Sequence, residues 1–155
     1  MSGLINSAGS RSGVIGVTVV PEESGTFTWQ MIGSGGSAGA SYAATLDPGK
    51  YVKQGRNVYF SLYGYLTHKG SYADFFIVTD LPFTNVDTKG LGRMPCILTN
   101  YPSTNVDAAW RTASIQNNSK QIRFQSGSRM DVVAPYSEVV TNYAVQISGF
   151  YFTDD

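Results

Sequence analysis

The chain is poor in the residues that build metal sites, disulfides and most catalytic centres. It has one cysteine and one histidine among 155 residues. A single cysteine excludes a disulfide within the chain, and it excludes zinc sites that need several cysteines. Cys96 stands in the apolar stretch MPCILT, where we expect a buried and unreactive thiol. We therefore expect no cofactor and no metal site, apart from weak calcium binding by aspartates in loops.

Charge is also scarce, and it is balanced. Asp, Glu, Lys and Arg make up 14% of the residues, with 11 acidic and 11 basic side chains, whereas about 25% is typical of soluble domains. Without a basic face, the chain is not expected to bind nucleic acid or an anionic membrane. A low-charge surface rich in Ser, Thr, Asn, Gly and Tyr favours a protein that neighbouring subunits partly cover.

Long apolar runs are missing as well. No segment approaches the ~20 apolar residues of a membrane-spanning helix. The opening stretch LINSAGSRSGVIG, residues 4–16, lacks the apolar run of ~7–15 residues that an export signal needs. We expect a protein that folds in a reducing cytoplasm and keeps these N-terminal residues.

What the sequence does contain has the pattern of an all-β domain. Closely spaced turn residues separate stretches rich in Val, Ile, Phe, Tyr and Thr. We predict strands at residues 26–32, 42–46, 57–67, 75–79, 96–100, 109–116, 121–125, 130–134 and 141–152. A hairpin turn centred on Gln54-Gly55 precedes the third of them. About nine or ten short strands favour an antiparallel β-sandwich, or jelly-roll-like, fold. We expect an extended N-terminal arm and first strand over residues 1–20, and one sandwich domain over residues 21–155.

The clearest strand, residues 57–67, carries large side chains on both faces. Period-two alternation places the apolar side chains on the core face: Val58, Phe60, Leu62 and Leu66. The opposite face then carries Tyr59, Tyr63 and Tyr65. Rings with polar tips are favoured at protein interfaces, so we expect this face to meet another subunit. Coverage by the second sheet of a sandwich is the alternative.

The last strand is long, which places it in the centre of a sheet. Gly149 within it marks a bulge or a close approach of another chain segment.

No group of residues predicts catalysis. His68 lies in THKGSY, which is typical of an exposed turn, and the adjacent Glu22 and Glu23 point to opposite sides of an extended backbone. Neither a carboxylate pair nor a nucleophile with its base stands out. We therefore expect a protein that is not an enzyme.

Tryptophans suggest one binding alternative. Trp29 is expected in the core or in an interface. Trp110, in VDAAWRTAS, could stack on a sugar ring, with Asp107 and Arg111 as a polar rim if this segment lies at the mouth of a loop. A glycan contact at these three residues is kept as an alternative to simple packing.

Several motifs resemble those of β-rich structural proteins of tailed phages, especially tail-fibre-like proteins of cyanophages. One set is LINSAGSRSGVIG, then the acidic segment Pro21-Glu22-Glu23, then GTFTW. The other is YVKQGRNVYFSLYGYLT followed by DFFIVTDLPFTN. Together they cover roughly residues 4–85. The resemblance implies a non-enzymatic virion protein that is β-rich and usually trimeric.

The resemblance also implies structural roles for single residues. Tyr51 and Gly55 would set the hairpin, and Leu81-Pro82-Phe83 would end a strand and cap the edge of the core. In fibres the opening motif follows a shaft, whereas here it follows Met1-Ser2-Gly3, so we expect a free-standing module.

Our first hypothesis is a homotrimeric capsid decoration, or cement, protein on the virion surface, assembled in the host cytoplasm. It would contact sister subunits and the major capsid protein, or another virion protein. The expected interface residues are Leu4, Ile5, Val14, Ile15, Tyr59, Tyr63 and Tyr65. The alternative is the receptor-binding tip of a tail or neck fibre that recognises a host surface glycan.

Overall fold

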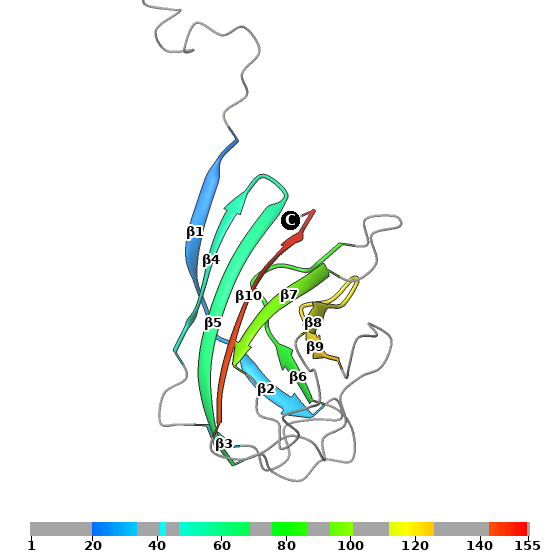
Figure 1. The fold of residues 1–155 in the computed structure, drawn as a ribbon. Helices are drawn as coiled ribbons and strands as arrows, with labels where there is room; N and C mark the ends of the chain where they lie inside the picture. The colour runs from blue at the N-terminus through cyan, green and yellow to red at the C-terminus, as the bar shows by residue number, and fades with distance from the viewer. Residues whose placement is uncertain are drawn as a thin grey trace, which may run out of the picture.

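The computed structural model describes residues 20–33, 41–42, 47–68, 76–86, 94–100, 112–125 and 143–154. The elements within these stretches are all strands (Figure 1): β1 (Glu22–Phe27), β2 (Gln30–Gly33), β3 (Ser41–Tyr42), β4 (Gly49–Gln54), β5 (Asn57–His68), β6 (Phe76–Thr79), β7 (Met94–Asn100), β8 (Thr112–Ile115), β9 (Ile122–Phe124) and β10 (Tyr143–Phe152).

The strands form one antiparallel sheet that curls on itself. Their order is β1-β4-β5-β10-β7-β8-β9-β6-β2, and β3 adds to the end of β5. The two ends of this path, β1 and β2, are joined in the chain by Thr28 and Trp29 alone. The sheet must therefore bend until its first and last strands meet, and in Figure 1 β2 passes behind the long strands β5 and β10 while β8 and β9 lie to the right of β7. This confirms the all-β, antiparallel, sandwich-like class.

One hydrophobic core lies inside the curled sheet, and strands from both ends of the sheet contribute residues to it. Its largest fully buried side chains are Trp29, Met31, Leu81, Ile115, Ile122, Phe124, Ile147 and Tyr151. On β5, Val58, Phe60 and Leu62 are buried as the alternation predicts. Burial of large apolar side chains is the main stabilising contribution to such a fold.

The last strand, β10, lies in the centre of the sheet as predicted, between β5 and β7. Gly149 allows the close approach that was expected there. A Cβ atom at this position would lie 3.1 Å from the Phe60 ring and 3.3 Å from the Cys96 sulfur.

The hairpin between β4 and β5 is present, but its turn lies one residue later than predicted. Gln54 pairs with Asn57, so the loop is Gly55-Arg56 rather than Gln54-Gly55. Gly55 has a φ of 59°. A positive φ at the first loop position is the pattern of a type II′ turn, which favours glycine there.

The single strand predicted at residues 26–32 is wrong, because two strands, β1 and β2, share this stretch. Phe27, Trp29 and Met31 are all buried, so the inward and outward alternation continues through the break. What changes is the neighbour, from β4 to β6. The Trp29 indole nitrogen donates to the Asp47 carbonyl at 2.9 Å, which fixes the crossing point.

Residues 80–86 cap one end of the core. Leu81 is buried, its N–H donates to the Lys120 carbonyl at 3.2 Å, and the Val86 N–H donates to the Phe152 carbonyl at 3.0 Å. The strand β6 ends at Thr79, so Pro82 does not end it. The chain turns earlier, at Asp80, whose φ is 67°.

Other predictions are corrected or fall outside the described residues. His68 is exposed as expected, but it is the last residue of β5 rather than part of a turn. The strand predicted at residues 109–116 is described from Thr112 onward. The strand predicted at residues 130–134, most of the one at 42–46, and the N-terminal arm up to residue 19 lie outside the described residues.

Candidate functional site

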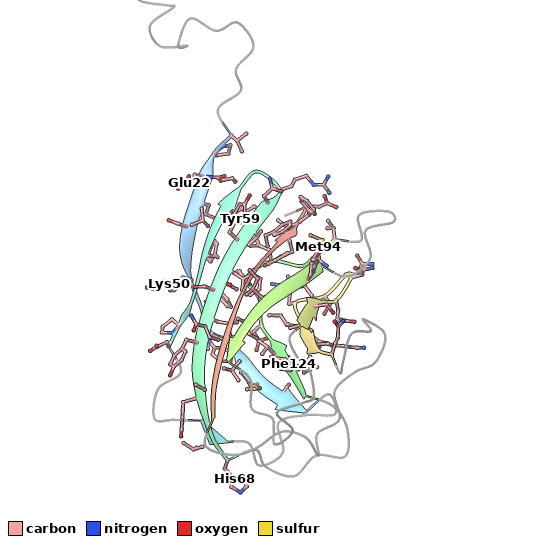
Figure 2. All side chains as sticks on the ribbon, in the orientation of Figure 1. Glu22, Lys50, Tyr59, His68, Met94 and Phe124 are labelled. Carbon is pink, nitrogen blue, oxygen red and sulfur yellow. The ribbon has the colours of Figure 1, made fainter. Side chains whose placement is uncertain are left out.

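The outward face of β5 carries three tyrosines in a row. Tyr59, Tyr63 and Tyr65 are 49%, 43% and 37% exposed, while Val58, Phe60 and Leu62 on the other side of the strand are buried. Their side chains point away from the interior because successive residues of a strand face opposite sides of a sheet. Figure 2 shows Tyr59 near the hairpin end of β5 and His68 at the opposite end. The structure thus places these tyrosines as the sequence predicts.

The neighbouring strand β10 extends this row sideways. Phe150 pairs directly with Tyr59, and their ring centroids lie 6.2 Å apart. Phe152 meets Phe150 edge-on at 6.2 Å. Phe150 is 41% exposed, and sequence reasoning missed it. The signal was present, since the alternation of β10 that buries Val145 turns Phe150 outward.

The next strand, β7, adds an exposed aliphatic residue. Ile97 is 66% exposed and pairs with Ser148 of β10, which in turn pairs with Ser61 of β5. We call this surface the outer aromatic face. It is made up of Tyr59, Tyr63, Tyr65, Ile97 and Phe150.

The strands that carry this face have no charged residue. Neither β5, nor β7, nor β10 contains an Asp, Glu, Lys or Arg. Well-solvated surfaces of small domains carry about 25–35% of such residues. An exposed aromatic surface without charge is the pattern found at the centre of protein interfaces.

Charged side chains gather at the margins of the face. Lys50 and Glu22 lie on β4 and β1, the strands beside it (Figure 2). Arg56, in the hairpin turn, forms an ion pair with Asp154. Glu22 accepts a hydrogen bond from the Gln54 amide at 3.0 Å. The face therefore has an uncharged centre and a rim with both signs of charge.

A second group of polar side chains lies at the hairpin end of β1 and β4. The Tyr51 hydroxyl donates to Glu23 Oε1 at 2.7 Å, and this hydrogen bond raises the pKa of Tyr51. The Lys53 amine lies 4.0 Å from Glu23 Oε2 and 4.6 Å from the centre of the Phe83 ring. The Glu23 carboxylate thus helps to hold β1 against β4.

Chemically reactive groups are sparse in the described part of the chain. No group of three or more His, Cys, Asp or Glu side chains there could hold a metal ion. Within the same residues, no helix is long and apolar enough to cross a membrane. Burial raises the pKa of the Cys96 thiol to about 12, so the thiol stays protonated and unreactive at neutral pH.

Seven of the predicted contact residues cannot be placed. Those outside the described residues are Leu4, Ile5, Val14, Ile15, Asp107, Trp110 and Arg111. Trp29, for which packing in the core or in an interface was expected, is buried in the core.

Comparison with known proteins gives no relative. No protein-family model, no curated protein and no solved structure matches the chain. The resemblance to structural proteins of tailed phages stays a prediction from sequence motifs.

Proposed function

We propose that this protein is a non-enzymatic structural protein of a phage virion, and that it serves as a homotrimeric decoration protein on the capsid surface. The observation that carries the proposal is the outer aromatic face. Its tyrosines and phenylalanine stay exposed on strands without charge, which supports a protein whose function is to be covered by other subunits.

The proposed mechanism is the burial of low-charge surface at the junctions between capsid subunits. Each Å² of apolar surface removed from water contributes about 25 cal/mol. Only the surplus over the costs of association appears as affinity. Repeated over many copies, this surplus would reinforce the capsid shell against the pressure of packaged DNA.

The copy number per particle tests the proposal. Quantitative mass spectrometry of purified virions should find the chain at a fixed ratio to the major capsid protein, in the large number that a capsid lattice provides. Its absence from purified virions would contradict a structural role. A copy number as small as that of tail proteins would move it from the capsid to an appendage.

The alternative, a glycan-binding fibre tip, is favoured by one feature. Exposed tyrosines in a row along β5 offer flat rings on which sugars could stack. A glycan array probed with the full chain separates the two functions, because a decoration protein binds no saccharide, whereas a receptor-binding tip binds a defined set.

A further inference from the structure

We propose that the outer aromatic face is the surface on which a second copy of this chain packs. The inference rests on the proposed function, in which the protein acts as an oligomer, and it assigns the self-association to particular strands. Attachment to the particle then belongs to another part of the chain.

The outer aromatic face has the features of the central part of a protein interface. Tyr59 and Phe150 are directly paired across β5 and β10, and their ring centroids lie 6.2 Å apart in a tilted arrangement. Rings held against one another on a sheet lose little freedom when a partner covers them, so less of the binding free energy is spent on ordering them. The charged residues stand at the rim, where water remains.

The size of the face suits a stable contact. Ten residues of β10 pair in unbroken register with β5. The three strands that carry the face are β5 with 12 residues, β10 with 10 and β7 with 7, and spacings of about 3.4 Å along and about 4.8 Å across give about 470 Å². A standard interface buries about 800 Å² on each partner. The outer aromatic face therefore supplies more than half of the area that one partner of a standard interface buries.

The absence of charge favours a copy of the same chain as the occupant. A partner recognised by its charge requires complementary charges on the surface that receives it, and β5, β7 and β10 have none. The chain has 11 acidic and 11 basic residues, so two copies do not repel each other. Uncharged faces of three copies can meet around the axis of a trimer without placing like charges together.

Sedimentation velocity of the full chain over a range of concentrations tests the inference. We expect an oligomer, and we expect Tyr63→Lys and Phe150→Lys each to weaken association by about 100-fold, because a lysine would be buried without a partner. The matched control is Gln30→Lys, which adds the same charge at an exposed position on β2 and should associate like the wild type. Near-UV circular dichroism checks that all variants are folded.

A second measurement does not depend on a destabilising substitution. Cys96 is buried, so Tyr63→Cys introduces one accessible thiol. We expect a thiol crosslinker to join two copies through this residue, and a cysteine placed at Gln30 to give no such product.

Two results would overturn the inference: a wild-type chain that stays monomeric at every concentration, or lysine variants that associate like the control. A monomer that is retarded in a gel containing a soluble polysaccharide would assign the face to glycan instead. A strictly monomeric chain would also contradict the proposed homotrimer, but none of these results alters the copy number in virions, so the proposed role as a virion structural protein is tested separately.

Discussion

At the scale of single residues, two glycines and two aromatic rings hold β1 against β4. Gly25 pairs with Tyr51 and Phe27 pairs with Gly49, so each strand offers one glycine to a ring of the other. Glycine weakens a strand because it lacks a side chain to pack. A ring laid across it restores the packing, and it also leaves no room for a Cβ atom.

Gly49→Ala should destabilise the protein by about 1–3 kcal/mol, the usual cost of overpacking. The added Cβ would lie 2.3 Å from the Phe27 ring, so this core side chain would have to move. Urea denaturation measures the change in the free energy of unfolding. The control is Lys50→Ala at the exposed next position, which should change it by less than about 0.5 kcal/mol. Equal stability of the two variants would contradict the close packing.

The hydrogen bond from Tyr51 to Glu23 predicts a loss of stability in alkaline solution. Because the bond raises the pKa of Tyr51 above its ordinary value of 10.0, its contribution is present below pH 10 and is lost as the pH rises through the higher, folded-state pKa. Denaturation curves of wild type and Tyr51→Phe should therefore converge above that pH. A difference that stays constant across this range would show that the phenol proton is not involved.

At the scale of whole elements, β10 holds together parts of the chain that are far apart in sequence. Its outward side carries Phe150, while its inward side carries Tyr151, whose ring packs against Phe60 at 6.0 Å. The Tyr151 hydroxyl also accepts a hydrogen bond from the Phe83 N–H at 3.2 Å. The segment that caps the core is thereby fixed to the central strand.

Tyr151→Phe removes that acceptor and should cost about 1–2 kcal/mol, because a partly buried N–H loses its partner. Tyr59→Phe deletes the same oxygen from an exposed ring and serves as the matched control, with little expected change. Thermal unfolding followed by circular dichroism compares the two. A Tyr151 variant as stable as the Tyr59 variant would mean that water replaces the lost bond.

The sequence predicts faces of strands better than it predicts their neighbours. Alternation along residues 57–67 correctly separates Tyr59 from Phe60, because a strand's period of two is a local property. The same alternation does not predict the break between β1 and β2 at Trp29. Burial alternates without interruption through this residue, while the neighbouring strand changes from β4 to β6. Which strand lies beside which depends on contacts between distant residues, and a local pattern does not contain them.

The candidate site, the outer aromatic face, could likewise be predicted only where a single strand determines it. The tyrosine row follows from one strand alone. The contribution of Phe150 depends on β10 lying beside β5, a pairing between segments more than seventy residues apart. Ile97 was missed because it follows the buried Cys96 in an apolar stretch, and only the pairing with β8 and β10 decides which of the two faces outward.

At the scale of the whole molecule, the low charge predicts how association responds to salt. Contacts between uncharged surfaces are not screened by ions, whereas exposed ion pairs weaken as salt is added. The described ion pairs involve the exposed side chains of Arg56, Asp154 and Glu23, at the hairpin end of the sheet. Self-association through the outer aromatic face should therefore persist at high salt. Dissociation of the oligomer in salt would point to the charged rim as the true contact.

At this scale the proposed function separates into two parts, self-association and attachment to the particle. If the outer aromatic face joins copies of the chain, then we expect attachment through the N-terminal residues, where Leu4, Ile5, Val14 and Ile15 are the predicted apolar contacts in a stretch of small residues. Deleting residues 1–16 should abolish co-sedimentation with particles that lack the protein, while the unfolding curve and the oligomer stay unchanged. Deleting residues 1–3 removes no anchor, so this control should bind normally. Normal binding after the longer deletion would transfer attachment to the sheet, and loss of the oligomer would mean that these residues join the copies themselves.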